Sequence, residues 1–86
     1  MDPYEVILHP IITEVSSRIL ETENKIVFAV SLTASKEAIK KAVEELYEVK
    51  VGKVTTLITS KGVKKAFVKL HPDYKAVDIA IKLGVI

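Results

Sequence analysis

Lysine is the residue type in this sequence whose number and spacing most clearly predict a chemistry. The stretch from Lys50 to Lys69 holds six lysines and no acidic residue. Eight lysines against two acids give residues 49–86 a formal charge of +6, whereas five basic residues against nine acids give residues 1–48 a charge of −4. Clustered positive charge repels itself unless an anionic partner neutralises it, so nucleic acid is the first partner to consider.

Alternation along this stretch predicts two strands, Val51 to Thr59 and Lys64 to Leu70, around a turn in which Gly62 supplies a positive φ. One face should enter the core: Val54, Thr56, Ile58, Ala66, Val68 and Leu70. The other should carry Lys53, Thr55, Leu57, Thr59, Lys65, Phe67 and Lys69. Lysine neutralises phosphate, threonine hydrogen-bonds phosphate or the 2′-hydroxyl, and Phe67 can stack on a base. An ordinary solvated face is the alternative, because edge strands are often lysine-rich to prevent aggregation.

Catalytic and metal-binding patterns are missing from the sequence. The two histidines precede prolines, His9 before Pro10 and His71 before Pro72, and neither has a partner at metal-ligand spacing. The serines have no recognisable activating base, and the three glycines are isolated rather than grouped in a phosphate-binding loop. We therefore expect neither an enzyme nor a cofactor or small-molecule substrate.

The bulk composition predicts one globular domain over residues 1–86. Zero cysteines exclude disulfides and, with acids near the N-terminus rather than a positively charged leader, favour an intracellular protein. No apolar run approaches the ~20 residues that span a bilayer. One Asn, no Gln and one Met fit the depletion of thermolabile residues in thermophiles.

The elements that must position the lysines can be read from periodicity and capping signals. We expect a brief strand at Val6-Ile7-Leu8 stopped by His9-Pro10, and a first helix capped by Thr13 and ending near Glu23-Asn24. A central strand should run from Lys25 to Leu32, and a helix capped by Ser35 from Lys36 to Glu48. After the hairpin, a last helix from Tyr74 to Leu83 should end at Gly84. This order predicts an α+β domain: a mainly antiparallel four-stranded sheet with helices packed on it.

Acidic residues of the first half form a second candidate surface. Glu14, Glu21 and Glu23 lie on or beside the first expected helix, away from the basic hairpin. A domain held on RNA by one face could offer this face to a protein, although a plain solvated helix explains the same residues.

Four segments together resemble one known family. They are His9-Pro10-Ile11-Ile12-Thr13-Glu14, the helix from Ala34 to Glu44, Val49-Lys50-Val51 leading to Thr56-Leu57-Ile58-Thr59, and Lys61 to Leu70. In this order they resemble the universal large-subunit ribosomal protein twenty-three, in its short archaeal form, over nearly the whole chain.

The resemblance implies a four-stranded sheet with helices that binds large-subunit rRNA beside the nascent-peptide exit tunnel in the cytoplasmic ribosome. It also implies contact with ribosomal protein twenty-nine and a docking surface for the signal recognition particle and other exit-site factors. The expected protein-docking residues are Glu14, which matches an acid associated with factor docking, and Glu21. The expected RNA-binding residues are His9, Pro10, Thr13, Lys36, Lys40, Lys53, Thr55, Thr59, Lys61, Lys64, Lys65, Phe67 and Lys69.

Two positions depart from the pattern of that family. Val15 stands where the family usually has lysine, and Thr55-Thr56 stands where it usually has Asn-Thr. The turn of about five residues around Lys61-Gly62 is too short for the tunnel-entering loop of bacterial members. The competing class is a small-ligand-binding or regulatory α+β domain that pairs its sheets in a dimer, which predicts an apolar pocket and weak, nonspecific RNA binding.

Overall fold

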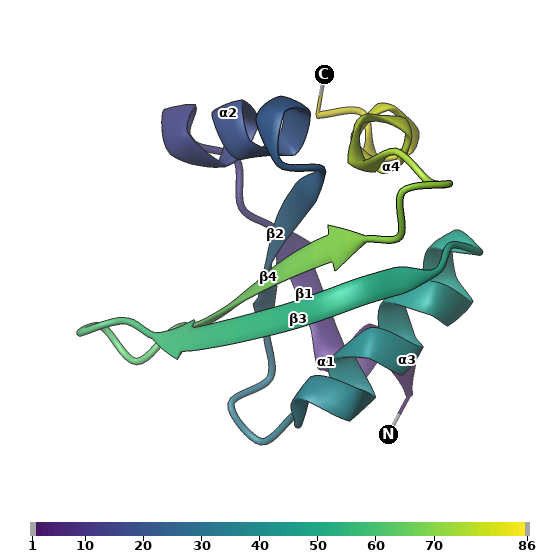
Figure 1. Ribbon diagram of the computed structural model, residues 1–86. Helices are drawn as coiled ribbons and strands as arrows, with labels where there is room; N and C mark the ends of the chain where they lie inside the picture. The colour runs from purple at the N-terminus through teal and green to yellow at the C-terminus, as the bar shows by residue number, and fades with distance from the viewer. Residues whose placement is uncertain (1, 86) are drawn as a thin grey trace.

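The computed structural model describes residues 2–85 (Figure 1). Helices and strands follow one another as α1 (Pro3–Val6), β1 (Ile7–Pro10), α2 (Glu14–Thr22), β2 (Lys25–Val30), α3 (Lys36–Tyr47), β3 (Val51–Ile58), β4 (Lys64–Leu70) and α4 (Ala76–Leu83). The strands form one sheet in the order β1-β2-β4-β3, and every neighbouring pair is antiparallel. The predicted α+β class and four-stranded sheet are therefore confirmed.

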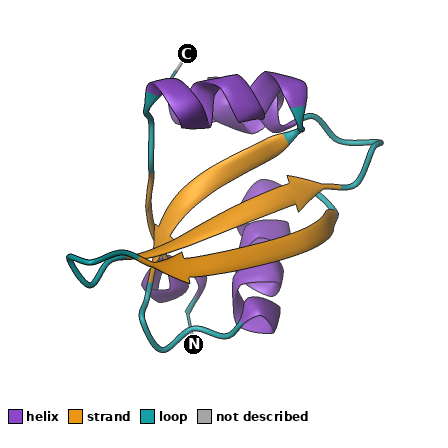
Figure 2. Ribbon diagram, turned by 60° about the vertical axis from the view of Figure 1, so that its left-hand side comes forward, coloured by secondary structure: helices purple, strands orange, loops and turns teal. Residues whose placement is uncertain are grey.

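The hydrophobic core lies on one face of this sheet. Phe28 of β2 and Val68 of β4 are fully buried there, together with Ile39 and Val43 of α3. The ring of Phe28 also stacks on that of Tyr47, with centroids 5.8 Å apart. Helices α1 and α3 lie together on this side, whereas α2 and α4 lie side by side at the end of the sheet where β2 begins (Figures 1 and 2). The other face of β3 and β4 carries the alternate residues, which are mostly Lys and Thr with Leu57 and Phe67 among them.

Capping residues fix the helix ends as the sequence predicted. The Thr13 hydroxyl accepts from Ser16 N at 3.1 Å, and Ser16 Oγ accepts from Thr13 N at 2.7 Å. The Ser35 hydroxyl accepts from Ala38 N at 3.1 Å at the start of α3. Gly84, with φ of 73°, ends α4 in the left-handed conformation that glycine adopts without steric cost.

The N-terminal prediction needs correction. Val6 closes a short helix instead of opening a strand, because the Asp2 carboxylate caps this helix by accepting from Tyr4 N at 2.8 Å. The strand then runs through the predicted stop and includes Pro10. Proline is tolerated because β1 is an edge strand and needs no donor on its outer side. A register shift between Ile7 and His9 leaves Leu8 as a bulge.

The last helix begins at Ala76 rather than Tyr74. The side chain of Asn24, which precedes β2, holds both residues: Oδ1 accepts from Ala76 N at 2.7 Å, and Nδ2 donates to Tyr74 O at 2.8 Å. Lys75, the N-cap residue of α4, makes no side-chain hydrogen bond to the helix. The side chain of Asn24, distant in sequence, therefore caps α4 instead.

The hairpin tip departs from the expected core face. Ala66, Val68 and Leu70 are buried as predicted, but Ile58 is 62% exposed. The hairpin projects past the helices, so no helix of residues 2–85 covers its far end (Figure 1). Among residues 2–85, no helix is long and apolar enough to cross a bilayer.

Candidate nucleic-acid interface

Three lysines form a row across three strands on the face opposite α3. Lys69 of β4 lies directly opposite Lys53 of β3 on one side and Lys25 of β2 on the other. Like charges that face each other across strands destabilise a sheet. Among residues 2–85, Lys25 alone of the three has an acidic partner, the Glu23 carboxylate 3.2 Å from its ammonium group. The row therefore concentrates uncompensated charge at one place on the domain.

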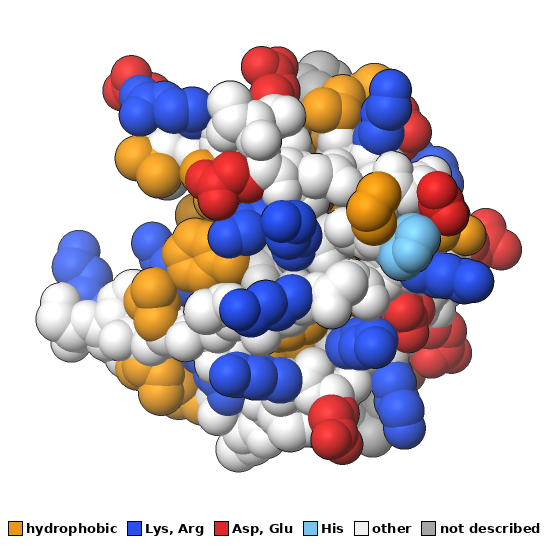
Figure 3. Space-filling model, in the orientation of Figure 1, with side chains coloured by type: hydrophobic (Ala, Val, Ile, Leu, Met, Phe, Trp, Pro, Cys, Tyr) orange, Lys and Arg blue, Asp and Glu red, His pale blue; other side chains and the backbone are white. Residues whose placement is uncertain are grey.

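The next two rows add the aromatic and hydroxyl groups. Phe67 lies between Thr55 of β3 and Val27 of β2, and the following row joins Leu57, Lys65, Ala29 and His9 across all four strands. We call Lys25, Lys53, Thr55, Lys65, Phe67 and Lys69 the lysine face. Lys and Arg side chains gather over β3 and β4 in Figure 3, with hydrophobic side chains among them toward the hairpin. The predicted alternation of Lys53, Thr55, Lys65, Phe67 and Lys69 is thus realised on one surface.

A bulge in β3 places Lys53 opposite Lys69. Val51 pairs with Leu70 and Lys53 with Lys69, so Gly52 is an extra residue between the two pairs. A Cβ at Gly52 would lie in van der Waals contact with the backbone, 3.4 Å from Lys69 O. The bulge allows Val51 and Val54 both to be buried while Lys53 stays exposed.

Lys64 differs from its neighbour Lys65. It pairs with Val30 and Ile58, on the side of the sheet opposite Lys65. Its ammonium group donates to Ala34 O at 2.6 Å, in the loop before α3. Lys64 therefore ties the base of the hairpin to the start of α3 and is not part of the lysine face.

The hairpin turn uses one of the predicted hydroxyls internally. Thr59 Oγ1 accepts from Val63 N at 3.2 Å, and Gly62, with φ of 79°, donates its N–H to Thr59 O. The strand β3 ends at Ile58, one residue before the predicted end at Thr59, so residues 59–63 connect the strands. Lys61 is exposed at the tip. Thr59 shapes the turn that presents Lys61.

Two further predicted lysines lie in another layer. Lys36 and Lys40 are exposed on α3, whose inner residues Ile39 and Val43 pack on the core face of the sheet. They are thus separated from the lysine face by the thickness of the sheet and α3. Neither forms an ion pair with another residue of the described chain, 2–85.

His9, Pro10 and Thr13 lie along the path from β1 to α2. His9 is exposed in the same row as Lys65, and its Nδ1 lies 2.9 Å from Pro10 O. Pro10 pairs with Phe28, whose side chain belongs to the core face. Thr13 lines a hollow together with Lys65 and Phe67. The structure thus brings His9 and Thr13 to the edge of the lysine face.

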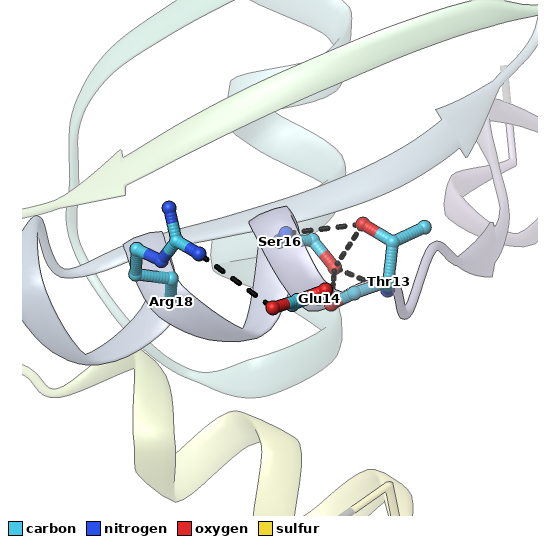
Figure 4. A network of polar contacts seen from close by, with 4 residues as sticks. All are labelled: Thr13, Glu14, Ser16 and Arg18. Carbon is cyan, nitrogen blue, oxygen red and sulfur yellow. Dashed lines mark hydrogen bonds and ion pairs between the residues drawn. The ribbon is translucent and has the colours of Figure 1, made fainter.

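The predicted acidic residues lie on an outer strip of α2. Glu14 and Arg18 form an exposed pair with an N–O distance of 3.8 Å, beside the Thr13–Ser16 capping box (Figure 4). Glu21 follows one turn after Arg18 and is also exposed. An exposed pair of this kind contributes little to stability, so both carboxylates remain accessible to a partner.

Lys25 and Val15 were missed as members of this region. Lys25 opens β2, and nothing in the sequence shows that β2 pairs with β4 rather than with β3. Val15 is 61% exposed on α2 and lines the same hollow as Phe67. A cross-strand or interlayer neighbour of this kind becomes visible only once the strand order is known.

The architecture is that of a small antiparallel α+β domain with a basic sheet face. A family model described as ribosomal protein L23 matches residues 5–84. The chain belongs to the ribosomal protein L23 family and is a structural protein of the large ribosomal subunit. This membership agrees with the family that its sequence segments resemble.

Proposed function

We propose that the lysine face binds large-subunit rRNA near the polypeptide exit tunnel of a cytoplasmic ribosome. The observation that carries this proposal is the row Lys25–Lys69–Lys53, whose mutual repulsion phosphate groups would relieve. Thr55 and Phe67, in the adjacent row, supply a hydroxyl and an aromatic ring within the same surface. Membership of the ribosomal protein L23 family makes rRNA the polyanion in question.

The mechanism is charge neutralisation combined with recognition of RNA shape. Exposed Lys53 and Lys69 displace counterions from phosphates, while Thr55 and Phe67 orient the backbone and bases. One small sheet cannot read many bases, so the fold of the RNA supplies most of the specificity. Lys36 and Lys40 on α3 contact rRNA in this proposal only if the RNA also reaches the opposite layer.

The acidic strip of α2 is proposed as the protein-docking side. Glu14 and Glu21 are exposed on α2 and do not line the hollow between α2 and the sheet. A strip of this charge is unsuited to phosphate and can receive basic groups of a protein. We assign it to the signal recognition particle and other exit-site factors, with ribosomal protein twenty-nine as a neighbour elsewhere on the domain. We further propose that the five-residue turn at 59–63, which would match the short archaeal form, is too short to reach the tunnel lumen.

The test is binding of the domain to fragments of large-subunit rRNA, with small-subunit rRNA as competitor. The proposal predicts preferential binding to one large-subunit fragment, with an affinity that falls steeply as salt is raised. Equal and weak binding to both RNAs would contradict it and return the domain to the ligand-binding or regulatory class.

A further inference from the structure

A hollow of about 290 Å³ separates α2 from β4 next to the lysine face. The space-filling surface is visibly hollowed between α2 and the hairpin (Figure 3). Its lining residues come from the β1–α2 connection, α2, β2 and β4: Ile11, Thr13, Val15, Ser16, Ile19, Val27, Lys65 and Phe67. This size is at the lower end of pockets that take small ligands, ~300 Å³, so the hollow has room for one compact group.

The walls of the hollow are apolar on both sides. Val15 and Ile19 are one turn apart on α2 and form one wall, while the aromatic ring of Phe67 belongs to the sheet side. Val27, which is 3% exposed, lies beside Phe67 in the sheet register. Val15 is 61% exposed although it is apolar, so it has unburied surface available to an occupant. An aromatic floor facing aliphatic side chains suits a flat, unsaturated group.

The positive charge in and beside the hollow favours a planar group that is attached to an anion. Lys65 lines the hollow itself, and the row of Lys25, Lys69 and Lys53 crosses β4 four residues further along, two residues beyond Phe67. A group that is apolar and planar but attached to an anion therefore finds complementary surfaces on both of its parts. A nucleotide has this combination, because its base stacks on aromatic rings while its phosphate pairs with lysine.

We propose that this hollow is a binding site for a single unstacked base of an RNA strand, held between Phe67 and Val15, with the adjoining phosphate on Lys65. The site rests on the proposed rRNA-binding function and adds α2 to the RNA interface. It also gives the interface one position at which a base, rather than the backbone alone, contributes to affinity. Glu14 and Glu21 do not line the hollow, so both stay free for protein.

The test compares two probes of equal length and charge: an oligoadenylate of about eight nucleotides and an abasic ribose-phosphate oligomer. The unmodified domain should bind the oligoadenylate about tenfold more tightly, since one stacked base contributes roughly that factor. Val15→Ser and Phe67→Leu should each reduce this preference by at least about threefold. Ile81→Ser is the matched control, because Ile81 is also an exposed helical residue (58%) but lies on α4, outside the hollow. It should leave the preference unchanged.

Three results would overturn the base site and can be told apart. Equal, salt-dependent binding of both oligomers would agree with the proposed RNA binding but contradict the base site, and the hollow would then bind another group, such as a protein segment. A preference lost in Phe67→Leu but kept in Val15→Ser would place the base on the open sheet instead. Loss of salt-dependent binding to both oligomers would contradict the proposed function as well. Circular dichroism of each variant confirms that its fold is intact before the affinities are compared.

Discussion

Lys53 of β3 and Lys69 of β4 lie directly opposite each other, and neither has an acidic partner within 4.0 Å among the described residues. Such a pair opposes folding of the free domain and favours its complex with an anion. The register of the hairpin therefore links the stability of the domain to the occupancy of its basic face.

Lys69→Gln should stabilise the free domain while weakening its RNA complex. Removing the central charge of the row relieves repulsion with Lys53 and Lys25, for a gain of a few tenths of a kcal/mol at low salt. Urea unfolding measures this gain, which should disappear at high salt. The matched control is Lys82→Gln in the last turn of α4, where a positive charge is favourable and its loss should bring no stabilisation. A destabilised Lys69→Gln variant at low salt would show that the row is not under electrostatic strain.

Lys64 and Lys65 should respond oppositely to replacement by methionine. Lys64→Met removes the bond to Ala34 O, so we expect a loss of about 1 kcal/mol of unfolding free energy and a small change in the salt dependence of RNA binding. Lys65→Met should keep stability and reduce the log–log salt slope by about one unit, because one phosphate contact is lost. Thermal unfolding and binding in a salt series measure the two effects. A slope change for Lys64→Met as large as that for Lys65→Met would place Lys64 in the RNA interface.

Much of the fold could be predicted because its signals are local. Hydrophobic periodicity located α3, and the side chains of Thr13 and Ser35 identified the starts of α2 and α3. Alternation in the hairpin identified which side Lys53, Lys65 and Lys69 share. What could not be predicted depends on tertiary neighbours: the Asn24 cap of α4, the bulge at Leu8, and the edge position of β1 that allows Pro10 to remain in a strand.

The same distinction explains the limits of site prediction. Residues on β3 and β4 were assigned a face by alternation, which is a local property. Lys25 joins them only through the pairing of β2 with β4. Alternation already places Lys64 on the opposite side of the sheet, but its bond to Ala34 O, 30 positions away, depends on tertiary structure. The distance between Lys36 and the lysine face likewise depends on which side of the sheet α3 covers.

Glu14→Lys should weaken recruitment of the signal recognition particle to ribosomes and spare rRNA binding. Glu14 is exposed and its only ion pair within residues 2–85 is the weak contact with Arg18, so the substitution should leave the fold intact. Co-sedimentation with ribosomes that carry the variant measures recruitment, and Glu37→Lys, an exposed first-turn acid on α3, controls for the change in charge. Lost rRNA binding in Glu14→Lys alone would place Glu14 in the RNA interface.

Stability should fall at alkaline pH in a way that depends on Tyr47. Partial burial, and secondarily the nearby Tyr4, raises the pKa of the Tyr47 phenol above its ordinary value. The unfolded chain releases this proton first, so the stabilisation is complete below the ordinary tyrosine pKa of about 10 and is lost as pH rises toward the folded pKa. Urea midpoints between about pH 9 and about pH 11 should decline less in Tyr47→Phe than in the unmodified domain. Equal declines would mean that Tyr47 does not contribute.

The most direct test of the account is the salt dependence of binding to a large-subunit rRNA fragment. About five lysine–phosphate contacts predict a log–log slope near −4 for the unmodified domain. Combined Gln substitutions at Lys53, Lys65 and Lys69 should flatten it by about 2 to 3 units. The control carries the same three charge losses at the exposed Lys41, Lys75 and Lys82, away from the lysine face, and should retain the original slope. Equal slopes for the two triple variants would contradict the assignment of RNA binding to the lysine face.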